Sequence, residues 1–295
     1  MTKWSNPDTK RLQPMTSVPT IISGLREIAG GYDALICDVW GVMHDGLHPH
    51  LAAVEALRRF RAEQGLVVLL SNAPRPSAPI EQQLTQIGVP AGCYDAIVTS
   101  GAAAREDIER RAAAGSLAMM HIGPERDRPL YDGLNVELVG PEKAAVALVS
   151  GLYDDEIETP ENYRGVLAEL KNRKLPMVCA NPDIFVPRGG KLLYCAGALA
   201  RAYEEIGGEV VYYGKPHLPI YKVALEAAGS PKHPLVVGDG LETDMLGANR
   251  LGIDALFIAD GVHGEEVGAL TPGNLAALFA KKGVYARAAM GALAW

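Results

Sequence analysis

The chain alternates short apolar stretches with longer stretches in which apolar residues recur about every third or fourth position. The short stretches are rich in Val, Ile and Leu, which is typical of strands buried on both faces. The longer period is typical of amphipathic helices, as in residues 49–65, where apolar side chains recur from Leu51 to Phe60 and a glycine ends the segment. The predicted strands are residues 34–39, 66–70, 96–99, 235–237 and 255–258.

Strands that alternate with helices predict right-handed βαβ units and therefore an open parallel sheet. We accordingly predict an α/β protein with a doubly wound, Rossmann-like parallel sheet. Ligands of such sheets bind beyond the carboxyl ends of the strands. Four polar residues occupy such ends: Asp38, Ser71, Thr99 and Asp239.

A second αβ domain is predicted as an insertion into the first. It follows the third predicted strand, has strand-like runs of its own and contains the turn-rich segment 181–191. The charged segment 104–115, which precedes most of it, is predicted to be a helix with a solvated face. The predicted boundaries are 20–114 and 209–295 for the core domain, 115–208 for the inserted domain and 1–19 for a flexible N-terminal arm.

Composition narrows the choice of partners. The 295 residues carry a formal net charge of -7 and have a pI near 5.6, so a general attraction to nucleic acid or to anionic membranes is not expected. The four cysteines never occur at Cys-x-x-Cys spacing, the apolar runs are strand-sized, and the first residues lack the apolar core of a signal peptide. We expect a cytoplasmic protein whose partner is a small molecule.

Four short segments that end or follow apolar runs carry the groups needed for phosphoryl transfer. A carboxylate nucleophile, a hydroxyl, an ammonium and two further carboxylates are the parts for transfer through an aspartyl-phosphate, with a divalent cation offsetting the charge repulsion. Each segment alone also fits a turn or a helix cap, but their order along the chain favours a shared site. The residues are Asp38, Ser71 with Asn72, Lys215, and Asp239 with Asp244.

This order of segments resembles the haloacid dehalogenase-like (HAD) superfamily, and within it the class IIA phosphatases. The resemblance covers nearly the whole chain after the N-terminal arm, and it implies an HAD core with an inserted αβ cap domain. The interval between Asp38 and Ser71 is too short for a cap, whereas the interval between Ser71 and Lys215 is long enough. The resemblance further implies Mg²⁺, a small phosphorylated metabolite as substrate, and a homodimer formed through the caps.

The resemblance implies the ligands of the metal. Asp38 would be both the nucleophile and a Mg²⁺ ligand, and Asp239 the second side-chain ligand. Asp244 would support the metal site, and the backbone carbonyl of residue 40 would complete the protein's share of the ligands.

The resemblance also implies the groups on the substrate side. Ser71 would bind the phosphoryl group with Asn72 beside it, and Lys215 would stabilise the nucleophile and the transferred phosphate. The segment "ANPD" resembles the "TNPD" segment with which such caps reach the active site, so Asn181 and Asp183 are candidate substrate ligands; turn and helix-cap roles are the alternative.

One position departs from the family's pattern. The phosphatases carry aspartate two residues after the nucleophile, as the general acid that protonates the leaving oxygen, and here that position is Trp40. General acid–base catalysis contributes about 10²–10⁴-fold. We therefore expect weak activity toward alkyl phosphates, whose leaving groups need the proton most. Trp40 also fits a packing role under the cap or a platform for a ring-bearing substrate.

Two other functions stay open on the sequence. A phosphometabolite-binding protein with lost or low turnover would keep the pocket without the acid. A metal-independent haloacid dehalogenase would also have an aromatic residue at position 40, but Asp239 and Asp244 argue against it, because retaining both beside Asp38 makes sense only with a cation.

A histidine-rich loop follows the predicted nucleophile. His44 or Asp45 could replace the missing acid, and His44, Asp45, His48 and His50 together could form a metal cluster. The alternative is a set of solvated loop residues at the mouth of the site.

Overall fold

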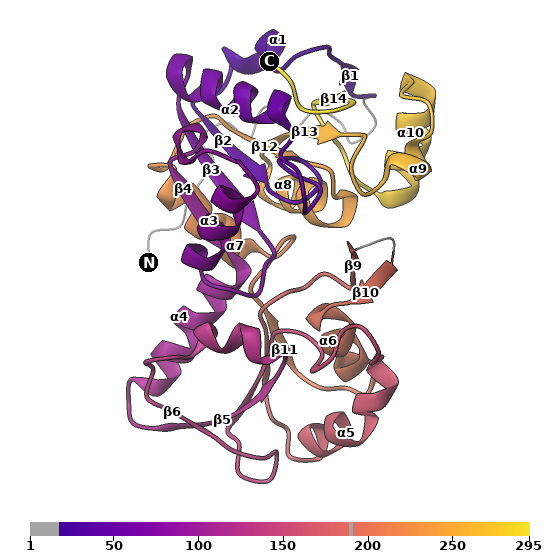
Figure 1. Cartoon of the computed structure of the whole chain (residues 1–295). Helices are drawn as coiled ribbons and strands as arrows, with labels where there is room; N and C mark the ends of the chain where they lie inside the picture. Colours follow the sequence, from indigo (N-terminus) through magenta and orange to yellow (C-terminus); the bar gives the residue numbers. More distant parts are fainter. Residues whose placement is uncertain (1–17, 189–190) are drawn as a thin grey trace. The chain divides into compact units, whose positions relative to one another are not determined.

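A computed structural model describes residues 18–188 and 191–295 (Figure 1). The predicted N-terminal arm, 1–19, lies outside the described residues except for its last two positions. The chain forms two compact units. The core unit comprises the residues up to Ser71, Glu81–Ile97 and Tyr221–Trp295, and the inserted unit comprises Asn72–Ile80 and Val98–Ile220. The inserted unit therefore contains all of residues 115–208 and extends beyond them on both sides.

The core unit contains a seven-stranded sheet in the order β1-β14-β13-β12-β2-β3-β4. Neighbours from β1 to β3 pair in parallel, which confirms the predicted parallel α/β sheet. Five of the strands lie where the apolar runs predicted them, within one or two residues at each end. The bounds are β1 Thr20–Ile21, β2 Ala34–Asp38, β3 Leu66–Ser71, β4 Ala96–Thr99, β12 Pro234–Gly238, β13 Asp254–Ile258 and β14 Ala288–Met290.

The sheet reverses its winding between β2 and β12. From β2 the chain adds β3 and β4 on one side, and from β12 it adds β13 and β14 on the other. All five residues of each of these two central strands are buried, as the apolar runs require. A doubly wound sheet binds its ligand outside the carboxyl ends of the strands at such a switch point. Asp38 ends β2 and Asp239 follows β12, so both lie at this position.

The helices have one apolar face each. Helix α2 buries Val54, Leu57 and Phe60 of its predicted apolar stripe together with Ala53 and Ala56, whereas Leu51, the first residue of that stripe, is 71% exposed. Among the described residues, every helix is too short or too polar to cross a membrane. The helices are α1 Arg26–Ala29, α2 Leu51–Glu63, α3 Ser77–Gln86, α4 Ser100–Ala112, α5 Arg164–Asn172, α6 Ala196–Glu205, α7 Leu218–Ala227, α8 Leu246–Leu251, α9 Gly264–Val267 and α10 Pro272–Lys282.

Helix α4 has the solvated charged face that the sequence predicted, since Glu106, Glu109, Arg110 and Arg111 are exposed. It begins at Ser100, where the Thr99 hydroxyl accepts the backbone N–H of Ala102, so Thr99 serves as a helix cap. Within the charged segment, Asp107 is buried and forms ion pairs with Arg110 and Arg111 at 3.0 and 2.8 Å. The helix has one buried face because small and apolar residues alternate with its charges at helical spacing.

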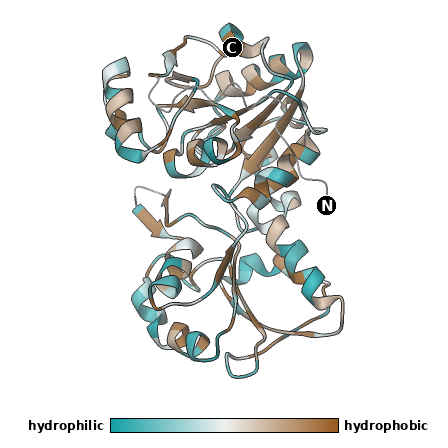
Figure 2. Ribbon diagram, turned by 180° about the vertical axis from the view of Figure 1, so that it is seen from behind, coloured by the Kyte–Doolittle hydropathy of each residue, from teal (hydrophilic) through white to brown (hydrophobic). Residues whose placement is uncertain are grey.

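The inserted unit has its own five-stranded sheet in the order β11-β8-β7-β5-β6, with every neighbouring pair parallel. Successive residues of its strands enter two apolar clusters, one on each face: Ala147 and Val149 pack with α6, and Val146 and Leu148 with α4. Figure 2 shows the apolar strands between helices that are partly polar. The bounds are β5 Leu117–Ile122, β6 Val136–Leu138, β7 Val146–Val149, β8 Met177–Cys179 and β11 Val210–Tyr212, with a hairpin of β9 Phe185–Arg188 and β10 Lys191–Tyr194.

Candidate active site

Three buried carboxylates meet at the switch point of the core sheet. Asp38 ends β2, Asp239 follows β12, and Asp244 lies in a π-helical turn, Leu241–Met245, just beyond it. One carboxylate oxygen from each lies within 4.8 Å of the other two, and the three residues are only 9%, 2% and 1% exposed. Three like charges at this separation are costly to bury unless a cation offsets them. An all-oxygen donor set of this kind fits a hard divalent cation such as Mg²⁺.

Backbone N–H groups orient these carboxylates. Asp38 Oδ1 accepts the N–H of Val39 at 2.7 Å, and Asp239 Oδ2 accepts the N–H of Val262 at 2.8 Å. Asp244 Oδ2 accepts the N–H of Gly240 at 3.2 Å. Each carboxylate is therefore held by the loop around it, which is the preorganisation that a metal or catalytic site requires.

Two glycines let the backbone approach Asp239 closely. A Cβ at Gly41, which has φ +82°, would lie 2.1 Å from Asp239 Oδ2, and a Cβ at Gly261 would lie 2.0 Å from the same atom. Gly261 and Val262 are not among the residues that the sequence predicted for this site. The available signal was the Asp-Gly pair at 260–261, which follows a predicted strand.

Ser71 also lies at this edge of the core sheet. It is the last residue of β3, and the residue before it, Leu70, pairs with Asp38 across the β2–β3 ladder. Its side chain is buried. The structure therefore places the predicted nucleophile and the predicted phosphate-binding hydroxyl at neighbouring strand ends.

The remaining predicted residues come together in the inserted unit. The Asn72 amide nitrogen donates to Asp183 Oδ1 at 2.7 Å and to the Lys215 carbonyl at 3.2 Å, and its oxygen accepts the N–H of Lys215 at 2.7 Å. Asn72 thus uses its whole amide to join two loops. Asn181 accepts the N–H of Asp183 at 3.0 Å, which is the turn role that was its alternative. Lys215 is 2% exposed, which is rare for lysine unless its charge has a partner.

Trp40 is half-buried and packs over the loop that follows it. Its backbone pairs with His44, and the Gly41 N–H donates to the His44 carbonyl at 2.9 Å. A Cβ at Gly46 would lie 3.6 Å from the indole Nε1, so the ring lies against the far end of the same loop. The residue at the position of the family's general acid is therefore part of the loop's packing.

The histidine loop differs from the expected solvated loop at His44. This residue is 4% exposed, and its Nδ1 accepts the N–H of Gly46 at 2.8 Å. Burial lowers the pKa of His44 below its usual range, so the ring is neutral with its proton on Nε2. A neutral imidazole is a poor proton donor, which weighs against His44 as the substitute acid.

Asp45 is exposed and closes a local turn. Its Oδ1 accepts the backbone N–H groups of His48 and Leu47, and these bonds lower the pKa of Asp45 below its usual range. It is therefore ionised at neutral pH and cannot donate a proton there. His50 Nδ1 bonds the Val42 carbonyl at 3.0 Å. Within residues 18–188 and 191–295, only the three aspartates form a group that could hold a metal, so the histidine metal cluster that the sequence left open as an alternative is not formed.

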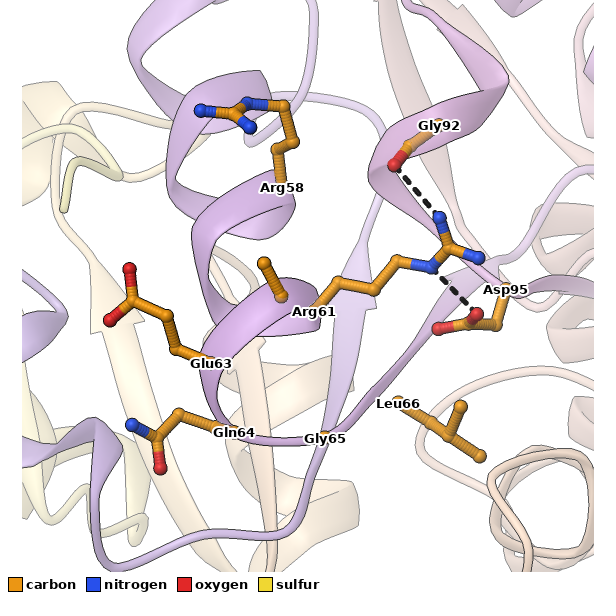
Figure 3. A pocket seen from close by; sticks show the side chains of 9 residues that line it. Arg58, Arg61, Glu63, Gln64, Gly65, Leu66, Gly92 and Asp95 are labelled. Atoms are coloured by element: carbon orange, nitrogen blue, oxygen red, sulfur yellow. Dashed lines mark hydrogen bonds and ion pairs between the residues drawn. The ribbon is translucent and has the colours of Figure 1, made fainter.

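A cavity of about 530 Å³ in the core unit lies away from these residues (Figure 3). It opens at Leu66, the amino end of β3, whereas the three aspartates lie at carboxyl ends. Its Arg61 is already bound by Asp95 Oδ1 at 2.7 Å and by the Gly92 carbonyl at 3.0 Å, and Arg58 pairs with Glu55. The cavity therefore offers no unpaired cation to an anionic ligand.

Comparison with known proteins gives the family. Residues 35–137 match the family model of haloacid dehalogenase-like hydrolases, and residues 212–284 match a second HAD-hydrolase-like model. A solved haloacid dehalogenase-like hydrolase of Brucella suis is 42% identical, with a TM-score of 0.81 over 92% of this chain and 100% of that one. The chain belongs to the haloacid dehalogenase-like hydrolase family. The order of its segments and the long insertion after Ser71 make it a member of class IIA.

Two more distant matches come from Mycobacterium tuberculosis. A D-glycerol 3-phosphate phosphatase is 27% identical over 250 residues, which cover 81% of this chain but only 66% of that protein. A glycerol phosphate phosphatase solved in complex with magnesium is 25% identical, with a TM-score of 0.62 over 83% of this chain and 73% of that one.

Proposed function

We propose that the protein is a Mg²⁺-dependent phosphoric monoester hydrolase that acts on a small phosphorylated metabolite through an aspartyl-phosphate at Asp38. The observation that carries this proposal is the buried group of Asp38, Asp239 and Asp244 at the switch point of the core sheet. The phosphatases among the relatives support the reaction class, and the magnesium complex of one of them supports the cation.

The proposed reaction uses the chain's own groups in two displacements. A carboxylate oxygen of Asp38 attacks phosphorus, and the bond to the leaving oxygen breaks with its electron pair on that oxygen. Water then attacks the aspartyl-phosphate, which releases inorganic phosphate and restores the Asp38 carboxylate. The Ser71 hydroxyl and the Lys215 ammonium bind the phosphoryl oxygens. A magnesium ion bound by Asp38, Asp239 and the Trp40 carbonyl, with Asp244 in support, would neutralise charge on the carboxylates and the phosphoryl group.

The test is hydrolysis of a panel of phosphate monoesters with Mg²⁺ and with EDTA. We expect activity only with the metal and only in the presence of the Asp38 carboxylate. Full activity in EDTA would contradict the proposal, and halide release from haloacids under the same conditions would support a dehalogenase instead.

Removing one carboxylate of the metal site should weaken metal binding and turnover together. Asp239→Asn replaces a charged ligand by a neutral amide of the same shape, so we expect the Mg²⁺ concentration for half-maximal activity to rise about tenfold or more. Calorimetric titration with Mg²⁺ measures the binding directly. The matched control is Asp254→Asn, since Asp254 accepts the Tyr32 hydroxyl on the same sheet and can keep that bond as an amide. Equal Mg²⁺ affinity in wild type and Asp239→Asn would refute the assignment.

The Asn72 amide offers a test of the loops in the inserted unit. Asn72→Ala removes the side-chain hydrogen bonds that the Lys215 N–H and the Asp183 carboxylate make with this amide, and a buried N–H left unsatisfied costs about 1–3 kcal/mol. We expect a lower midpoint of thermal unfolding and a lower kcat, because Lys215 would lose its fixed position. Asn249→Ala is the matched control, because Asn249 also bonds the N–H and the carbonyl of one residue, Tyr285. That variant should lose stability but keep its kcat; equal losses of kcat in both variants would count against a positioning role of Asn72.

Trp40 gives a specific reason to retain a second candidate function. With an aromatic residue in place of the general acid, a phosphometabolite-binding protein with low turnover would have the same pocket. Tight Mg²⁺-dependent binding of a phosphorylated metabolite, with no release of phosphate across the panel, would favour this second function.

A further inference from the structure

The inserted unit contains a cavity of about 560 Å³ at the carboxyl ends of three of its strands. His121 lies in β5, Leu138 ends β6, and Tyr153 follows β7. The strand order β6-β5-β7-β8-β11 places the switch point of this second parallel sheet between β5 and β7. Parallel sheets of this kind bind ligands beyond the carboxyl ends of the strands at the switch point. In the core unit Asp38 and Asp239 lie at that position, and in the inserted unit this cavity does. Its volume falls within the range of small-molecule sites, about 300–1,000 Å³.

Aromatic rings form the walls of the cavity. Tyr153 stacks with one face on the buried Tyr163, with 5.8 Å between ring centroids and 27° between the planes. Its hydroxyl donates to the His121 carbonyl at 3.2 Å, which fixes the ring beside the end of β5. Tyr153 is nevertheless 50% exposed and lines the cavity, so it presents an ordered aromatic surface to an incoming ligand. Tyr131 lines it too, edge-on to His121 at 5.0 Å.

A directional chain of hydrogen bonds holds this wall in place. The Tyr131 hydroxyl donates to His121 Nδ1 at 3.4 Å, and His121 Nε2 donates to the Ser150 hydroxyl at 3.0 Å. Ser150 in turn donates to the buried Asp127. Burial lowers the pKa of His121 to about 4, so the ring is neutral at neutral pH, and Nε2 is its donor because the Ser150 hydroxyl donates its own proton to Asp127. A Cβ at Gly123 would lie 2.0 Å from the Ser150 oxygen, so glycine is needed where the backbone crosses this chain.

The charges of the residues that line the cavity indicate which class of ligand it can bind. None of the nine residues that line the cavity is lysine or arginine, and Glu125 is the one charged side chain among them. The lining therefore supplies no cation to a phosphate group, and the nearby Arg128 is already paired with Glu125 at 3.3 Å and with Asp132 at 2.9 Å. Pro124, Leu138 and Val139 add apolar surface, while backbone groups at Gly123 and Gly140 lie at the rim of the strands. This combination fits a flat ring that stacks on tyrosine and carries its own hydrogen-bonding edge.

We propose that the cavity at the ends of β5, β6 and β7 binds a neutral, planar heteroaromatic compound of the size of a purine nucleoside, stacked on Tyr153. The site lies within the inserted unit and uses none of the residues assigned to phosphoryl transfer. It is therefore independent of the proposed hydrolase reaction.

Equilibrium binding of adenosine and riboflavin to the full chain tests this proposal. The titrations contain Mg²⁺ and BeF₃⁻ to occupy the candidate active site, and a second series adds inorganic phosphate. We expect saturable binding of at least one probe with no displacement by phosphate. Tyr153→Ala should weaken that binding about tenfold, in line with the loss of one stacking platform, whereas Tyr153→Phe should keep most of it.

A second variant, in which a larger side chain fills the cavity, tests the proposal even if Tyr153→Ala is poorly folded. Leu138 lines the cavity and is 53% exposed, so Leu138→Trp should block the site without burying new volume in the core. Leu192→Trp is the matched control, since Leu192 is 68% exposed in the same unit and does not line the cavity. Absence of saturable binding of both probes up to millimolar concentration would overturn the proposal. Binding that Tyr153→Ala and Leu138→Trp leave within twofold of wild type, or that phosphate displaces, would overturn it as well.

Discussion

Asp38→Asn is expected to lower kcat by about 10⁴-fold or more, because it removes the nucleophile and leaves no carboxylate to form the phosphoenzyme. The amide keeps the shape of the side chain, and its oxygen can still accept the Val39 N–H that now binds Asp38 Oδ1. The loss should therefore appear without a large change in the midpoint of thermal unfolding. Initial rates on p-nitrophenyl phosphate measure it.

A second readout identifies the attacked atom. Wild type quenched during turnover should carry one phosphoryl group on the peptide that contains Asp38, as detected by mass spectrometry, and Asp38→Asn should carry none. Asp33→Asn is the matched control, because Asp33 immediately precedes β2 and accepts the backbone N–H groups of Lys232 and His233. That variant should retain activity. Hydrolysis by Asp38→Asn at the wild-type rate would exclude Asp38 as the nucleophile.

The strands of the fold were predictable where burial alone determines the sequence. The residues of β2 and β12 are all buried, so their apolar runs have no polar interruptions. Strand β1, at the edge of the sheet, and its neighbour β14 are two and three residues long, and β14 is the sequence Ala-Ala-Met. Their pairing depends on neighbouring strands supplied by distant parts of the chain, so no local pattern marks them.

The residues of the candidate site also fall into those that the sequence predicts and those that only the folded chain shows. Asp38 and Asp239 were predictable because parallel strands bring their carboxyl ends to one edge, and the switch point selects two of these ends. The role of Asn72 was not predictable from the sequence. Its amide bonds Asp183, which is 111 positions away, and only the folded chain shows that contact. In the sequence His44 resembles a solvated loop residue. In the structure its ring is buried and accepts the N–H of Gly46 from the turn that follows.

The other large effect concerns the leaving group. If Trp40 replaces the general acid, wild type should hydrolyse p-nitrophenyl phosphate about 10²–10⁴-fold faster than glycerol phosphate, since the aryl oxide leaves without a proton and the alkoxide does not. The loop strengthens this expectation, because its buried His44 is neutral and its Asp45 is held ionised by two backbone N–H groups. The ratio of kcat/KM for the two esters is the measurement.

Restoring the acid should reduce that ratio. Trp40→Asp is expected to raise glycerol phosphate hydrolysis by about 10–10²-fold, below the full contribution of a general acid, because the new carboxylate enters a loop packed around an indole. Trp40→Phe is the control that changes the ring without adding an acid, and it should give no gain. Because the ring is half-buried against Gly46, circular dichroism must first show that each variant is folded. Similar wild-type rates on both esters, unchanged in His44→Ala and Asp45→Asn, would show that the leaving oxygen receives its proton without a side chain of this loop, and the role assigned to Trp40 would then be wrong.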